Sequence, residues 1–167
     1  MLTKIISGGQ TGADQGALDA AIKLGLPHGG WLPKGRPTEE GPLDEKYKLQ
    51  EMPTASYSAR TEKNVVDSDG TVILSHTEEL SGGSKLIQDL ARRHWKPCLH
   101  INLSEVPAFI ASSEINTWVR EHNIKVLNVG GPRASKDPDI YRDTYYVIQG
   151  TILLDLGDTR YGETLRD

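Results

Sequence analysis

Short apolar runs alternate with helix-like apolar stripes along most of this chain. The run at residues 2–6 precedes a stretch in which Ala17, Leu18 and Ala21 recur at helical spacing. Further strands are predicted at 71–74, 98–103 and 125–129, and further helices at about 85–94, 107–122 and 139–154. This alternation predicts an α/β fold, a Rossmann-like three-layer sandwich with a mostly parallel central sheet.

Two stretches do not follow this pattern. Residues 28–57 are rich in proline and have no sustained period, which predicts either a long ordered loop or an excursion of short strands. A helical pattern resumes at Ser58. Residues 155–167 are polar and contain glycine, and we expect no element of their own there. We therefore expect a single Rossmann-like domain, residues 1–154, followed by a C-terminal tail, residues 155–167.

Composition narrows the partners and the setting. The chain has 167 residues and a formal charge of −4, from 19 Lys and Arg against 23 Asp and Glu. This charge offers no broad attraction for phosphate backbones, which argues against nucleic acid as a partner.

Cys98 is the single cysteine, so no intrachain disulfide or cysteine zinc cluster can form. We therefore expect a cytoplasmic protein in which Cys98 is a small buried hydrophobe. No stretch approaches the roughly 20 apolar residues of a membrane span.

Three glycine-rich turns each lie just before a predicted helix. The first turn is residues 7–14, the second turn is residues 80–84 and the third turn is residues 130–135. We expect all three at the carboxyl edge of the sheet, where ligands of such folds bind. A glycine turn that opens a helix presents free backbone N–H groups to an anion. The alternative is that the glycines of the first turn only bend the chain while Thr11 or Asp14 caps the helix.

The turns do not match common nucleotide motifs. The first turn does not fit GxGxxG, and no acidic residue ends a second strand about 20 residues later, which argues against an ordinary NAD site. The pattern GxxxxGK[ST] is absent, which argues against a P-loop nucleotidase. The expected ligand is instead a phosphate-bearing, nucleotide-like molecule or another oxyanion.

Several residues outside the glycines could complete this site. Trp31 could stack on a flat ring, with Lys34 and Arg36 binding phosphate; alternatively, Trp31 fills the core and the two cations are solvated. Arg60 and Asn64 share one helical face. Arg133 lies in the third turn beside Ser135, where a guanidinium could complete an anion cradle; a plain surface position is the alternative for these residues as well.

No catalytic or metal-ligating residue is predicted. The five histidines, His28, His76, His94, His100 and His122, show no HxH, HxxxH or HExxH spacing. Asp67 and Asp69 fit turn chemistry better than a divalent cation site. The sequence also shows no arrangement of Ser, His and acid that is typical of a nucleophilic enzyme.

At these positions the chain resembles a known family. It is similar to the molybdenum carrier family, a circularly permuted branch of the Rossmann-like SLOG group. The SLOG group also includes the Lonely Guy proteins. The matching stretches are SGGQTGAD, HGGWLPKGR, ELSGGS, ARRHWKPC and LNVGGPRASKDPDIY, together with Tyr57, Arg60, Thr61, Asn64 and the DSDGT block. The resemblance implies binding of molybdenum cofactor (molybdopterin), molybdate or another nucleotide-like ligand. It also implies a homo-oligomer, either a dimer or a tetramer.

The same resemblance bears on catalysis. ELSGGS resembles the PGGxGTxxE loop with which Lonely Guy proteins cleave a nucleoside 5′-monophosphate, but residues 84–89 here lack the GT and offer no clear match for the glutamate. We therefore expect a carrier, and a phosphoribohydrolase (N-glycosidase) is the alternative. The expected ligand-binding residues are Gly8, Gly9, Gln10, Thr11, Gly12, Asp14, Trp31, Lys34, Arg36, Arg60, Asn64, Ser81, Gly82, Gly83, Ser84, Gly130, Gly131, Arg133 and Ser135.

Overall fold

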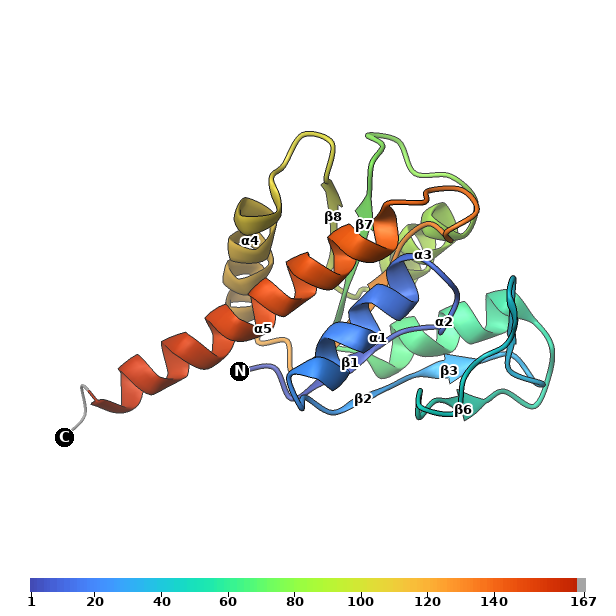
Figure 1. The fold of residues 1–167 in the computed structure, drawn as a ribbon, viewed down its shortest axis with the longest axis horizontal. Coiled ribbons are helices and arrows are strands. Elements are labelled where there is room, and N and C mark those ends of the chain that lie inside the picture. The colour runs from blue at the N-terminus through green and yellow to red at the C-terminus, as the bar shows by residue number, and fades with distance from the viewer. Residues whose placement is uncertain (165–167) are drawn as a thin grey trace.

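A five-stranded, fully parallel sheet forms the centre of the protein (Figure 1). The computed structural model describes residues 1–164. The strands, in spatial order, are β2 (His28–Gly29), β1 (Lys4–Ile6), β9 (Val126–Gly130), β7 (Gly70–Ser75) and β8 (Cys98–Asn102). Strand β7 is buried along its whole length, as expected for a strand covered on both faces.

Helices cover both faces of this sheet. Helices α1 (Ala13–Lys23), α4 (Ala108–Glu121) and α5 (Ile140–Thr164) share the larger apolar core, which includes Ile5, Val72 and Leu127 of the strands. Helices α2 (Tyr57–Asp67) and α3 (Gly82–Arg93) pack together on a smaller core with Val65, Leu90 and Ala91. The predicted three-layer sandwich is confirmed.

Residues 30–56 form the predicted excursion of short strands, whereas residues 28–29, which were expected to belong to it, form strand β2 of the central sheet. Strand β3 (Trp31–Leu32) pairs with β6 (Gln50–Glu51), and β4 (Pro37–Thr38) pairs with β5 (Gly41–Pro42). A small buried cluster of Leu18, Leu32, Leu43, Tyr47 and Leu49 fixes this excursion to α1. It therefore lies over the first glycine turn.

The expectation that residues after Leu154 form no element is wrong for residues 155–164. Helix α5 continues through them to Thr164 and extends beyond the sheet (Figure 1). Two contacts explain the extension: the buried Asp155 carboxylate accepts a 2.6 Å hydrogen bond from the Leu2 backbone N–H, and Leu156 packs against the main core. Residues 165–167 of the expected tail lie outside the described residues.

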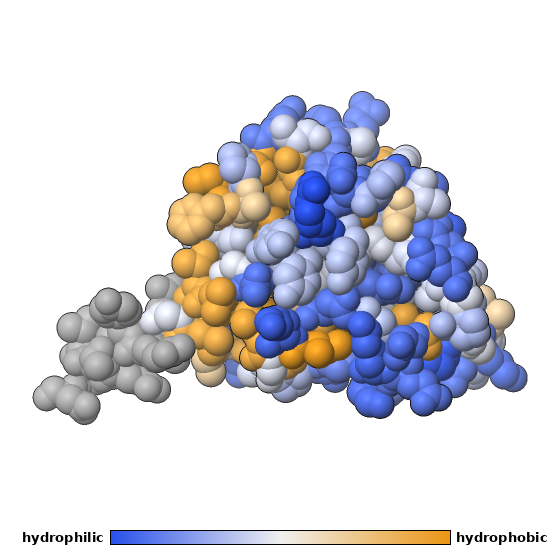
Figure 2. Space-filling model, viewed as in Figure 1, coloured by the Kyte–Doolittle hydropathy of each residue, from blue (hydrophilic) through white to orange (hydrophobic). Residues whose placement is uncertain are grey.

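The surface is uneven in polarity. Figure 2 shows apolar residues over α4 and the middle of α5, and mostly hydrophilic residues at the opposite end. Phe109 and Ile110 of α4 and Leu153 of α5 are each more than half exposed. No helix within residues 1–164 has the length and apolar character needed to cross a bilayer.

The order of the strands creates a crevice at the carboxyl edge of the sheet. The connection β1–α1–β2 leads toward one edge, whereas β7–α3–β8 leads toward the other and runs over the opposite face. Strand β9 lies between β1 and β7. The connections that leave β1 and β7 therefore run in opposite directions, with β9 between them. Parallel sheets bind ligands at the carboxyl ends of strands where this reversal occurs.

Candidate functional site

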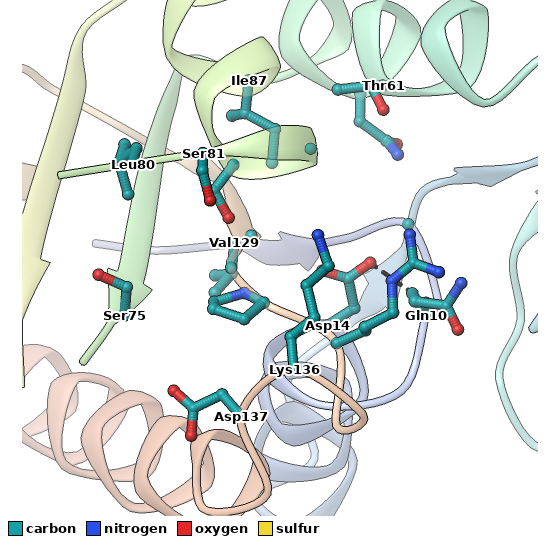
Figure 3. A pocket seen from close by; sticks show the side chains of 18 of the residues that line it. Gln10, Asp14, Thr61, Ser75, Leu80, Ser81, Ile87, Val129, Lys136 and Asp137 are labelled. Carbon is teal, nitrogen blue, oxygen red and sulfur yellow. Dashed lines mark hydrogen bonds between the residues drawn. The ribbon is translucent and has the colours of Figure 1, made fainter. Parts of the chain in front are cut away.

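A cavity of about 450 Å³ occupies this crevice (Figure 3). Its volume is in the range of sites that bind small molecules. Residues from all three glycine turns and from α2 form its wall. The lining comprises Gly8, Gln10, Asp14, Tyr57, Arg60, Thr61, Asn64, Ser75, Thr77, Leu80, Ser81, Gly83, Ser84, Ile87, Asn128, Val129, Gly130, Gly131, Pro132, Arg133, Lys136 and Asp137.

The second glycine turn presents unpaired donors to the cavity. Within the described residues, the backbone N–H groups of Gly82, Gly83 and Ser84 at the start of α3 have no hydrogen-bond acceptor, and the Ser81 side chain does not cap them. Ser84 is only 7% exposed and lines the cavity. Its hydroxyl group has no hydrogen-bond partner within the described residues. A Cβ on Gly83 would meet no atom within 4 Å, so open space adjoins these amides.

Lys136 brings a cation to the same place. A Cβ on Gly82 would come within 3.3 Å of Lys136 Nζ, and Figure 3 shows the lysine side chain extending into the cavity from the loop after β9. No carboxylate in the described part of the chain pairs with this ammonium group. Because a helix N-terminus is itself positive, an anion between Lys136 and α3 would be attracted by both.

The first glycine turn is different, because several of its amides are occupied. The Asp14 carboxylate accepts a hydrogen bond from the backbone N–H group of Gln10 at 3.1 Å. The Gln10 side chain accepts one from Thr11 N at 3.0 Å, and Ala13 N donates to the Pro132 carbonyl at 3.1 Å. The expectation that this turn offers free amides is therefore wrong for Gln10, Thr11 and Ala13, whereas the amides of Gly9 and Gly12 have no acceptor within the described residues. No side chain caps α1, so the capping alternative is wrong as well.

Arg60 lies across the first turn. Its Nη1 donates to the Gly8 carbonyl oxygen at 2.7 Å and lies 3.7 Å from the Asp14 carboxylate. Its buried Nε has no partner within the described residues. Burial raises the pKa of Asp14 above its ordinary value, although the positive charge of Arg60 acts in the opposite direction.

The third turn packs against the first with very little space. A Cβ on Gly12 would come within 2.4 Å of the Pro132 carbonyl oxygen, and one on Gly131 within 2.3 Å of the Leu74 carbonyl oxygen. Gly12 also has a φ of 81°, which favours glycine. These two glycines are explained by close packing of backbone, and Gly9 is likewise packed under Leu43 and Leu49.

Thr11 and Ser135 bind a carboxylate of the protein itself. The Glu39 carboxylate accepts hydrogen bonds from the hydroxyl groups of both residues and from Ser135 N. These contacts, mainly the two hydroxyl groups, hold the pKa of Glu39 below its ordinary value. Neither Thr11 nor Ser135 lines the cavity, so their donors serve to join the β4–β5 hairpin to the two turns.

Of the remaining candidates, Asn64 lines the cavity but its amide group is already used. Its Oδ1 accepts from Trp31 N and its Nδ2 donates to Trp31 O, which anchors α2 to β3. Trp31 and Lys34 lie outside the cavity lining, and the Trp31 indole donates to Asp67 at 2.8 Å. The Arg36 guanidinium also lies outside it and donates to backbone carbonyl groups between residues 43 and 49.

The structure thus brings together eleven of the nineteen candidates in the lining: Gly8, Gln10, Asp14, Arg60, Asn64, Ser81, Gly83, Ser84, Gly130, Gly131 and Arg133. The other eight lie outside it: Gly9, Thr11, Gly12, Trp31, Lys34, Arg36, Gly82 and Ser135. Sequence reasoning missed Lys136 and Thr77. Lys136 follows the third turn directly, and a charged side chain so close to a glycine turn is the signal that could have included it.

One wall of the cavity is fixed by a histidine between two carboxylates. His76 Nδ1 lies 2.7 Å from Asp137 and its Nε2 lies 2.9 Å from Asp143 at the start of α5. Burial lowers the pKa of His76, but the hydrogen bonds and negative charges of the two aspartates outweigh burial and raise it above its ordinary value. In the described residues, no group of three His, Cys, Asp or Glu side chains is placed to hold a metal ion.

Comparison with known proteins agrees with this architecture. The model of the Circularly permutated YpsA SLOG family matches residues 5–152. The chain belongs to this family. It is also similar to the crystal structure of a protein from Syntrophus aciditrophicus SB, named as a candidate molybdenum carrier, with 56% sequence identity and a TM-score of 0.87 over 90% of this chain and 94% of that one. None of the curated proteins matches this chain.

Proposed function

We propose that this SLOG protein binds a phosphate-bearing heterocyclic molecule in the cavity and acts as its carrier. The name of the Syntrophus aciditrophicus protein favours a ligand that contains molybdenum, either molybdenum cofactor or molybdate, and a nucleotide is the other candidate. The observation that carries the proposal is the meeting of the free α3 amides, the Ser84 hydroxyl and the Lys136 ammonium group at one end of the cavity.

The charge of the cavity supports an anionic ligand. Its two carboxylates each have a partner within the protein, since Asp14 lies beside Arg60 and Asp137 beside His76. Lys136 and the positive end of α3 have no such counter-charge in the described residues. A phosphate group placed between them would accept hydrogen bonds from the amides and form an ion pair with Lys136.

The α2 side of the cavity suits a flat ring. Tyr57 lines it with its side chain about half exposed, and the Arg60 guanidinium lies 5.6 Å from the Tyr57 ring centre. Thr61 of the same helix also lines the cavity, and its hydroxyl group donates to the Tyr57 carbonyl oxygen at 2.9 Å (Figure 3). A heterocycle could stack on Tyr57 while its phosphate reaches α3.

Calorimetric titration tests this proposal directly. Wild-type protein is titrated with molybdenum cofactor, molybdate, AMP and adenosine. We expect binding of at least one phosphate-bearing ligand or molybdate, no binding of adenosine, and a loss of affinity in Ser84→Ala. Lys34→Gln serves as the control, because Lys34 lies outside the cavity. Absence of binding to all four ligands contradicts the proposal.

A second candidate function is favoured by the Asp14–Arg60 pair. Residues 84–89 offer no clear match for the glutamate of Lonely Guy proteins, and no carboxylate of α3 lines the cavity, but Asp14 places a buried carboxylate there. In this candidate, water adds to C1′ of a nucleoside monophosphate while the bond to the base breaks; Asp14 takes a proton from that water, and the base gains one from solvent. Adenine release from AMP that is lost in Asp14→Asn and Arg60→Ala would favour hydrolysis, whereas binding without release favours the carrier.

A further inference from the structure

Trp95 occupies an unusual position at the end of α3. The tryptophan is 94% exposed and has a φ of 55°, in the left-handed region. Helices α1, α3 and α4 all end in the same hydrogen-bonded turn, whose left-handed residue is Gly25, Trp95 and Asn123, respectively. Glycine and asparagine are the residues that adopt this conformation most readily. Neither packing nor backbone preference within the single chain therefore explains a tryptophan at residue 95.

Two unpaired cations accompany Trp95. Arg92 and Arg93, in the last turn of α3, are exposed, and no carboxylate of the described chain forms an ion pair with either. The sheet also ends here, because β8 follows directly and has β7 as its neighbour on one side only. Exposed Trp and Arg side chains are the types that contribute most to protein interfaces.

A groove of complementary character lies on the same edge of the sheet. It is formed between β8 and α4 and has a volume of about 480 Å³. Leu99, Ile110 and Trp118 supply its apolar surface, and Glu114 and Glu121 supply negative charge. Neither glutamate has an ion-pair partner within the described residues. This edge thus carries both an exposed tryptophan flanked by two arginines and an apolar groove flanked by two glutamates.

We propose that two copies of this chain associate through this edge, with Trp95 of each copy in the β8–α4 groove of the other. Arg92 and Arg93 then face Glu114 and Glu121 of the second copy. A contact in which each copy supplies both halves is the self-complementary arrangement that a two-fold dimer requires. Burial of the indole offsets the unfavourable backbone conformation of Trp95.

This dimer would leave the cavity open. Trp95 follows the C-terminal end of α3, whereas the cavity adjoins the N-terminal end, and a helix of 12 residues separates them. That length corresponds to about 18 Å. The proposed interface is therefore independent of the ligand proposal, and either can fail without the other.

Sedimentation equilibrium over a range of protein concentrations tests the interface. We expect wild type to reach twice the 18.4 kDa chain mass and Trp95→Asn to remain at the single-chain mass with an unchanged far-UV CD spectrum. Leu153→Asn, at an exposed apolar position on α5, is the control and should still dimerise. A monomeric wild type, which would leave this surface to a different protein, overturns the proposal, as does a Trp95→Asn dimer as stable as wild type.

Exchange of charges gives a sharper version of the test. The double variants Arg92→Glu/Arg93→Glu and Glu114→Arg/Glu121→Arg should each be monomeric alone, because like charges then face each other. Mixed together, they should form a heterodimer through one restored set of ion pairs. Failure of the mixture to associate, while each variant remains folded by CD, would count against the proposed pairing.

Discussion

The Arg60 guanidinium lies in the space that a side chain on residue 8 would fill. A Cβ built on Gly8 would come within 1.7 Å of Arg60 Nη1, and the same nitrogen donates to the Gly8 carbonyl oxygen at 2.7 Å. The absence of a side chain at residue 8 therefore permits α2 to approach the first glycine turn. This contact, together with the Asp14 carboxylate, forms one wall of the cavity.

Gly8→Ala should therefore destabilise the protein. The new methyl group displaces Arg60, so the buried Asp14 carboxylate loses its cationic neighbour, a change that costs roughly 3 kcal/mol. Chemical denaturation measures the loss in free energy of unfolding. Gly83→Ala is the matched control, because open space surrounds that glycine; its stability should stay close to wild type or rise slightly. Equal destabilisation by both substitutions would contradict this account of Gly8.

Lys136→Gln should weaken binding of a phosphate-bearing ligand without affecting stability. Loss of one charge-assisted hydrogen bond corresponds to a decrease in affinity of roughly 10-fold or more. Calorimetry with AMP, or with molybdenum cofactor if that is the ligand that binds, measures the change. The remaining affinity of the variant should also depend less on salt concentration than that of wild type. An affinity equal to that of the Lys34→Gln control would exclude Lys136 from the site.

His76 should make stability depend on pH. Its pKa in the folded protein is raised above 6.5, the ordinary value, so its interaction with Asp137 and Asp143 stabilises the fold fully below pH 6.5 and is lost as pH rises through the folded pKa. His76→Gln should consequently lose more stability at pH 6 than at pH 9, as measured by urea denaturation. His122→Gln, on the exposed end of α4, is the control. A loss that is the same at both pH values would show that the histidine is not acting through its charge.

Much of the fold could be predicted because it depends on local patterns. The alternation of apolar runs and stripes gives the strands and helices, and the parallel sheet then brings the ends of β1, β7 and β9 together. The extension of α5 could not be predicted from its polar composition. It depends on the pairing of Asp155 with Leu2, which lie 153 residues apart.

The site was harder to predict because three glycine turns of similar sequence serve different purposes. In the first turn the Asp14 and Gln10 side chains fold back onto the amides, whereas no side chain does so at the start of α3. Composition does not reveal which way these side chains turn. The Arg36 guanidinium similarly binds backbone carbonyl groups of its own loop, a contact that the residue type alone does not specify.

Amide NMR tests the central claim most directly. Uniformly ¹⁵N-labelled protein is titrated with AMP, and with inorganic phosphate in a parallel experiment, while the backbone N–H resonances are followed. Hydrogen bonding to phosphate should move the signals of Gly82, Gly83 and Ser84 strongly downfield and leave those of Gln10 and Thr11, whose amides are already bonded, nearly unchanged. Saturable shifts confined to the first turn, or no shifts at the start of α3 with either probe, would contradict an anion site at that helix.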